Sequence, residues 1–130
     1  MLTSTGNYLS KDSKFIFIKV GCEHLKVLFS DIIYIEAVNK YIRLFTRSKS
    51  YLVSATMNHM EEILPPDIFC RIHRSYIVSL EHTYKFDHDV FYIENKQLPI
   101  GKRYRSQLPG KTKTILIDQN KTGTDIDGAA

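Results

Sequence analysis

Short runs of β-branched and aromatic residues, separated by turn residues, are the feature that most restricts how this chain can fold. The runs predict strands at residues 15–20, 24–29, 32–37, 41–45, 51–53, 70–78, 84–86, 90–93 and 97–100. Helical spacing occurs at 57–64, which Pro65 follows, and at 102–108, which Pro109 follows. The sequence therefore predicts a mainly β fold with two short helices, and it excludes a helix-turn-helix domain.

A chain of 130 residues has room for one domain with its own core. Residues 1–13 are polar and are predicted to be a disordered leader or linker, and residues 14–109 carry the predicted strands and helices. The segment 110–130 is predicted to be a flexible tail in which residues 114–117 form one further strand.

The charge of the chain is unevenly distributed. Lysine and arginine number 18 against 14 acidic residues, a net charge of +4, which is compatible with a polyanionic partner. No acidic residue occurs from 37 to 60 or from 95 to 117, and the second of these stretches holds six lysines and arginines. The cations therefore gather in particular segments of the chain.

Common catalytic and metal-binding patterns are missing from the sequence. No serine lies in G-x-S-x-G or S-x-x-K, the five histidines lack zinc-site spacing, and no glycine loop for phosphate occurs. Three carboxylates, Asp87, Asp89 and Glu94, flank predicted turns and are interpreted as solvated hairpin residues. We therefore expect a protein that is not an enzyme and that uses neither a metal nor a cofactor.

The cysteines and the apolar runs bear on the compartment. Cys22 and Cys70 form no CxxC pair, so they are interpreted as small buried apolar side chains in a reducing, cytoplasmic protein. The longest apolar runs are far shorter than the roughly 20 residues that cross a bilayer. We expect no association with a membrane.

The segment 67–79 combines packing residues with hydrogen-bond donors. If it forms one extended strand, Arg71, His73 and Ser75 lie on one side, and Arg74 and Tyr76 on the other. Arginine forks on such a strand are typical of nucleic-acid recognition. The alternative for His73 is structural, and we prefer it: a neutral imidazole that hydrogen-bonds to backbone groups and holds the turn that aims Arg74.

The predicted last helix begins with two cations, Lys102 and Arg103, directly after Gly101. The helix dipole disfavours cations in the first turn, by a few tenths of a kcal/mol. Free N–H groups beside two cations make an anion site, for which a DNA phosphate is an obvious occupant. An ordinary surface helix is the alternative.

Four segments, at 31–37, 39–44, 69–79 and 98–104, together resemble the successive motifs of the LytTR DNA-binding domain. They read DIIYIEA, NKYIRL, FCRIHRSYIVS and LPIGKRY, and the resemblance runs from about residue 15 to 108. This domain is the output domain of bacterial response regulators of the LytR, AlgR and AgrA groups. The resemblance implies an elongated fold of antiparallel β-sheets with small helices, which inserts loops into the major groove of double-stranded DNA.

The resemblance also implies which residues meet DNA. The DNA-binding set comprises Lys40, Tyr41, Arg43, Arg74, Lys102, Arg103 and Arg105, with Asn39 and His73 as structural residues near the site. Ser79 stands where an asparagine is usual, and Gly101 where many relatives have a serine cap.

The implied function is sequence-specific transcription regulation in a bacterial two-component system. Two copies, as a homodimer on DNA, are expected on tandem repeats, with a receiver domain or a sensor kinase system as further partners. Whether the chain is free-standing or an excised output domain stays open. The alternative is a protein-interaction β-domain that does not bind DNA, with its partner on an exposed strand edge or on the 57–64 helix.

Overall fold

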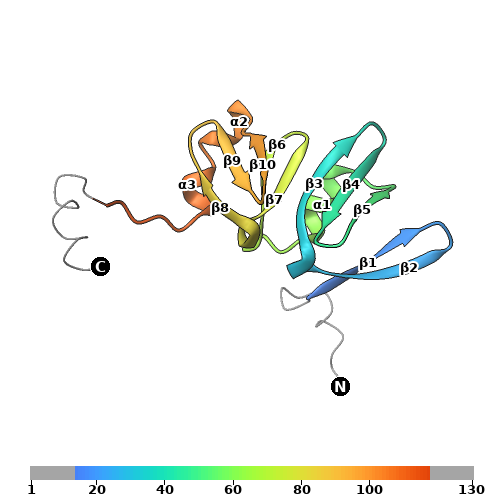
Figure 1. Cartoon of the computed structure of the whole chain (residues 1–130). Helices are drawn as coiled ribbons and strands as arrows, with labels where there is room; N and C mark the ends of the chain where they lie inside the picture. The colour runs from blue at the N-terminus through green and yellow to red at the C-terminus, as the bar shows by residue number, and fades with distance from the viewer. Residues whose placement is uncertain (1–13, 118–130) are drawn as a thin grey trace, which may run out of the picture.

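A computed structural model describes residues 14–117 of the chain (Figure 1). Predictions for residues 1–13 and for 118–130 lie outside these described residues. The strands and α-helices, in chain order, are β1 (Phe15–Val20), β2 (Glu23–Leu28), β3 (Ile32–Val38), β4 (Tyr41–Thr46), β5 (Ser50–Val53), α1 (Met57–Ile63), β6 (Phe69–His73), β7 (Tyr76–Ser79), β8 (Thr83–Phe86), β9 (Val90–Ile93), β10 (Lys96–Pro99), α2 (Lys102–Arg105) and α3 (Leu108–Lys111). Two short 3-10 helices, η2 (Phe29–Asp31) and η3 (Leu80–His82), precede β3 and β8.

The strands form three antiparallel sheets. The central sheet has five strands in the order β5-β4-β3-β7-β6, and it lies between the β1–β2 hairpin and a three-stranded sheet of order β10-β9-β8. The sheets follow one another across the molecule in Figure 1, which gives it an elongated outline. The predicted fold class, mainly β with antiparallel sheets and small helices, is confirmed.

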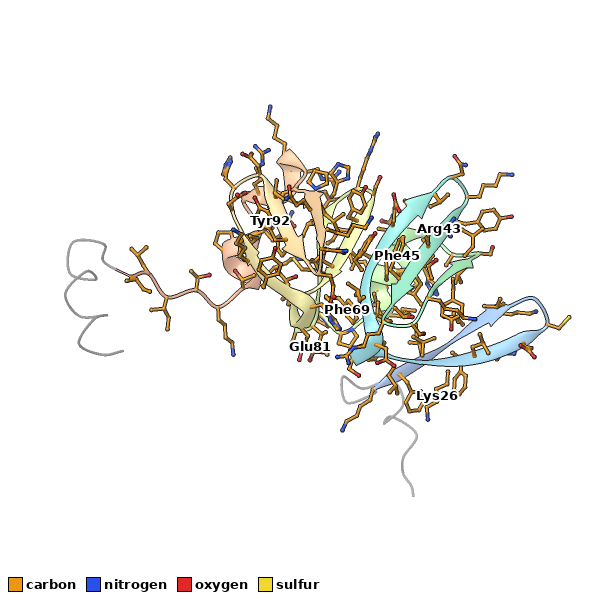
Figure 2. The ribbon with its side chains drawn as sticks, in the orientation of Figure 1. Lys26, Arg43, Phe45, Phe69, Glu81 and Tyr92 are labelled. Atoms are coloured by element: carbon orange, nitrogen blue, oxygen red, sulfur yellow. The ribbon has the colours of Figure 1, made fainter. Side chains whose placement is uncertain are left out.

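Side chains of the central sheet alternate between two cores. On β3, Ile35 packs into a first core with α1 and the β1–β2 hairpin, whereas Tyr34 packs into a second core with the three-stranded sheet, α2 and α3. On β4, Ile42 and Leu44 are buried in the first core, as the alternation predicts. Side chains fill both sides of the sheet in Figure 2, where Phe69 marks the first core. The central sheet is thus held from both faces.

The segment predicted as one strand at 70–78 is a hairpin instead. It consists of β6 and β7, joined at Arg74 and Ser75. Phe69 pairs with Ser79 and His73 with Tyr76, so the chain reverses where an uninterrupted strand was expected. The prediction was wrong because neither turn residue is a glycine, proline or asparagine, which usually mark a reversal.

The C-terminal segment also differs from the prediction. The single helix expected at 102–108 is two short helices, α2 and α3, so there are three α-helices among residues 14–117. Pro109 lies in the first turn of α3, where its missing N–H costs nothing, and so it does not end a helix. Residues 114–117 form no strand, and Ile115 and Leu116 are almost fully exposed. A run of apolar residues needs a neighbouring strand to pair with, and this one has none among the described residues.

Two further observations concern the cysteines and the helices. Cys70 is buried as predicted, but Cys22 is exposed in the β1–β2 turn beside Gly21, which has a positive φ of 65°. The expectation of burial for Cys22 was therefore wrong, because it lies at the tip of a hairpin. Within residues 14–117, every helix is too short or too polar to cross a lipid bilayer.

Candidate nucleic-acid interface

Three segments far apart in the sequence meet along one edge of the molecule. The β3–β4 turn, the β6–β7 turn and the start of α2 all lie at the upper edge in Figure 1. Hydrogen bonds join them: the Ala37 N–H donates to the Ser75 carbonyl (2.9 Å), and the Gly101 N–H donates to the Ile72 carbonyl (2.7 Å). We call this region the basic edge, defined by the exposed cations Lys40, Arg74, Lys102 and Arg103.

The β3–β4 turn supplies the first part of the basic edge. Asn39 has a positive φ of 54°, a conformation that asparagine adopts more readily than most residues, and it turns the chain so that Lys40 is exposed. Tyr41 beside it is 44% exposed. Arg43 is half-buried and pairs across the sheet with Glu36 of β3. Figure 2 shows Arg43 on β4 near this end of the sheet, whereas Lys26 lies on the β1–β2 hairpin at the opposite edge.

The β6–β7 turn carries Arg74, and its backbone is held by hydrogen bonds to two neighbouring side chains. The Ser75 N–H donates to His73 Nδ1 over 3.0 Å. The buried Arg71 side chain donates from Nε to the His73 carbonyl (2.8 Å) and from Nη2 to the Arg74 carbonyl (2.6 Å). The side chains of Arg71 and His73 thus hydrogen-bond to two carbonyls and one amide of the turn backbone, while the Arg74 side chain is exposed to solvent.

The surroundings of His73 favour the neutral form of its imidazole. Burial lowers the pKa of its imidazole below the usual value, and the guanidinium groups of Arg74 and Arg71 lower the pKa further. Because Nδ1 accepts from the Ser75 amide, the proton of the neutral ring lies on Nε2. This hydrogen bond is one backbone contact of the kind expected of a structural histidine in the β6–β7 turn.

The start of α2 packs directly on the β6–β7 hairpin. A Cβ on Gly101 would lie 3.1 Å from Cδ2 of Tyr104, which is a tight contact, and 3.5 Å from the Cα of His73, which is an ordinary van der Waals contact. Tyr104 is buried in the second core and anchors the helix. Lys102 and Arg103 are exposed at the start of α2, which packs against β6, and the Arg103 guanidinium lies 5.4 Å from the Tyr104 ring centre.

Arg105 stands apart from the other predicted residues. Its Nη2 lies 3.0 Å from Oδ1 of Asp89 in the β8–β9 turn, and its side chain is 30% exposed. The arginine is thus paired with an acidic residue on the three-stranded sheet, whereas no ion pair is formed by Arg74, Lys102 or Arg103 within residues 14–117.

Arg71 is a residue near the site whose role sequence reasoning missed. It was predicted only to share one side of a strand with His73 and Ser75, and it is 8% exposed on the face that packs against α1. The signal was present in the sequence, because alternation places Arg71 in phase with the apolar Phe69. An arginine in phase with a core residue is buried and needs a partner.

The carboxylates of the β8–β9 turn are structural, as the sequence indicated. Oδ1 of Asp87 accepts the N–H groups of Asp89 and Val90, both at 2.8 Å, and these bonds hold the pKa of Asp87 below its usual value. Within the described residues, no three histidine, cysteine, aspartate or glutamate side chains come together as metal ligands.

Comparison with known proteins decides the family. The model of the LytTr DNA-binding domain matches residues 23–113, which include all three segments of the basic edge. The chain belongs to the LytTR family of DNA-binding domains. It is accordingly a DNA-binding domain and not an enzyme.

Individual relatives agree with the family. Over 87 residues the chain is 37% identical to the sensory transduction protein LytR of Staphylococcus epidermidis. This match covers 66% of this chain and 34% of that protein. It is 40% identical over 55 residues to the CO-responsive transcriptional regulator RcoM of Rhodospirillum rubrum, covering 42% of this chain and 23% of RcoM. The chain thus spans well under half the length of these curated relatives.

A solved structure shares the fold. It is the LytTr DNA-binding domain of a putative methyl-accepting/DNA response regulator from Bacillus cereus, with a TM-score of 0.66 and 24% sequence identity. The similarity covers 76% of this chain and 96% of the other. The arrangement of sheets and small helices is therefore the LytTR fold.

Proposed function

We propose that this LytTR domain binds double-stranded DNA sequence-specifically, as part of a bacterial transcription regulator, with the basic edge in the major groove. The observation that supports the proposal is that Arg74 and Arg103 are both exposed, on segments that the hydrogen bond from Gly101 to Ile72 joins. Arginine donates bidentately to O6 and N7 of guanine, which only the major groove presents. Two such groups on one rigid edge can recognise two bases together.

The remaining residues of the edge divide by their exposure and partners. Lys102 is exposed and suits a phosphate contact that fixes the position of the domain. We propose a similar contact for Arg105, although its pairing with Asp89 reduces what it contributes. At the β3–β4 turn and the start of β4, we propose that Lys40, Tyr41 and Arg43 form a further surface that contacts DNA.

We make further proposals about the extent of the DNA-binding unit, its arrangement on DNA, its compartment and its control. We propose that residues 14–109 form the DNA-binding unit and that two copies occupy tandem repeats as a homodimer on DNA. A cytoplasmic setting suits a protein that binds chromosomal DNA. Because LytR and LytT relatives are called sensory transduction proteins, we propose that a receiver domain or a sensor kinase system controls the regulator.

DNA titrations with matched variants test base recognition. The probes are a duplex selected by this chain from a randomised library and a scrambled duplex of the same composition, followed by fluorescence anisotropy. Arg74→Ala and Arg103→Ala are each expected to weaken binding to the selected duplex by about 1 to 3 kcal/mol and to reduce the preference over the scrambled one. Lys102→Ala is expected to weaken both duplexes alike and to reduce the salt slope by about one unit.

The control is Lys26→Ala, which removes a cation from the edge opposite the proposed interface (Figure 2) and is expected to change neither quantity. Equal losses on the two duplexes for Arg74→Ala would show that Arg74 does not read a base.

One observation favours a second function, the binding of another protein. A groove of about 520 Å³ lies between the β1–β2 hairpin, β5 and α1, and Phe17, Leu52 and Ile63 along it are 59%, 46% and 43% exposed. Binding there would be apolar and insensitive to salt, whereas DNA binding weakens steeply as salt rises. A partner retained at high salt by a chain that binds no DNA would favour this function.

A further inference from the structure

We propose that Arg71 is a positioning residue for base recognition, which transmits the position of α1 to the Arg74 turn. The inference rests on the proposed function, because it assumes that Arg74 reads a base. It concerns a buried residue that cannot itself reach DNA.

The Arg71 guanidinium has two sets of partners on opposite sides. On the turn side, it donates to the carbonyls of His73 and Arg74 over 2.8 Å and 2.6 Å. On the helix side, Nη1 donates to Oε1 of Glu61 over 2.9 Å and to Oδ1 of Asn58 over 3.3 Å. A planar guanidinium with its donors in a fixed fork transmits the placement of one set of acceptors to the other.

The bond to the Arg74 carbonyl is the decisive contact. It fixes the peptide that follows the Cα of Arg74, and so it restricts the direction in which the Arg74 side chain leaves the turn. His73 holds the same peptide at its other end, because the Ser75 N–H that donates to His73 Nδ1 belongs to the peptide between Arg74 and Ser75. Arg71 and His73 thus hold this peptide from its carbonyl and from its amide, and of the two only Arg71 is also bonded to α1.

Burial makes this arrangement stiff. Arg71 is 8% exposed, so Glu61 compensates the charge of its guanidinium, and its hydrogen bonds do not compete with bulk water as surface bonds do. The guanidinium carbon also lies 5.9 Å from the ring centre of Tyr104, which anchors α2 and hence Arg103. The same side chain thus touches the supports of both proposed base readers.

The test is a double-mutant cycle between positions 71 and 74. Arg71→Lys keeps the positive charge beside Glu61 but cannot donate to both turn carbonyls. The measured quantity is the ratio of affinities for the selected and scrambled duplexes, in the full chain with and without Arg74→Ala. A loss of folded protein lowers the apparent affinity for every duplex by the same factor, so this ratio does not change through instability alone.

The expected result is a fall of about tenfold in the ratio for Arg71→Lys in the wild-type background. No further fall is expected when Arg74 is already alanine, because there is no reader left to orient. Arg47→Lys is the matched control: Arg47 is paired with Asp31 (3.9 Å) but has no bond to the Arg74 turn, and the ratio is expected to stay unchanged.

Glu61→Gln supplies a second variant if Arg71→Lys does not fold. Glu61 is 45% exposed, and glutamine keeps an acceptor while removing the charge, so a smaller fall in the ratio is expected, again only when Arg74 is present. Equal weakening on both duplexes, or the same fall in both backgrounds, would overturn the inference and leave the proposed function standing. If Arg74→Ala itself left the ratio unchanged, both the inference and base reading by Arg74 would fail.

Discussion

Replacing Ser79 by alanine is expected to stabilise the protein, although most core substitutions destabilise. Ser79 ends β7, is completely buried, and its Oγ has no hydrogen-bond partner in the described part of the chain. An unpaired buried hydroxyl costs about 1 to 3 kcal/mol. Alanine keeps the Cβ and the backbone, whose carbonyl accepts from Thr83 Oγ1 at 2.8 Å. The space left by one oxygen atom offsets part of the gain, so the free energy of unfolding is expected to rise by about 1 kcal/mol.

The assay is urea unfolding followed by circular dichroism, with thermal melts beside it. A gain of about 1 kcal/mol corresponds to a rise of roughly 4–8 °C in Tm for a domain of this size. The control is Val78→Ala at the neighbouring, equally buried position, where the loss of apolar contacts and the cavity are expected to cost about 2 kcal/mol. Lower stability of Ser79→Ala by more than about 0.5 kcal/mol would refute the reasoning, because it would show that the hydroxyl is paired.

Three further outcomes are expected. A thiol reagent should modify Cys22 quickly and Cys70 only on unfolding, because Cys70 is buried and burial raises the pKa of its thiol; equal rates would contradict this. The folded-state pKa of His73 lies below its usual value, so the contribution of His73 to the free energy of unfolding is fully present above about pH 6.5 and is lost as the pH falls. In urea melts the free energy of unfolding should therefore fall less between pH 7.5 and 5 in His73→Gln than in the wild type. Thr56→Ala removes the side chain that accepts from the His59 N–H (3.0 Å) at the start of α1, and should cost about 1 kcal/mol in the same melts.

The sequence predicted the strands well where the alternation was clean. On β4, Ile42 and Leu44 are buried as expected, because a strand with one covered face has only one register that buries its apolar residues. The hairpin at Arg74 could not be predicted in this way. Its reversal is fixed by bonds from the side chains of Arg71 and His73 and from the Ala37 amide of another strand. The Ala37 bond joins residues far apart in the sequence, and the Arg71 and His73 bonds, although local, join side chains to the backbone, so the alternation of apolar residues reveals neither.

The candidate site, too, could be predicted from the sequence only in part. The basic character of its segments could be read from the sequence, but their meeting at one edge depends on the pairing of β3 with β7 and on the Gly101–Ile72 hydrogen bond. Arg105 shows the cost of judging by sequence alone. It lies two residues after Arg103, yet it forms an ion pair with Asp89 in the β8–β9 turn. Tyr104, which lies between the two arginines, is buried in the core.

The close contact of Gly101 with the β6–β7 hairpin has a consequence for how DNA targets could diverge in evolution. Because the two backbones touch there, the separation between residues 74 and 103 is set by the fold and not by a pliable loop. If these residues read bases, the spacing between the two base positions is constant among proteins that keep this contact. New target sequences would then arise by exchanging the side chains at 74 and 103, whereas changes at the Gly101 contact would disturb the packing of α2 on β6 before they altered the site.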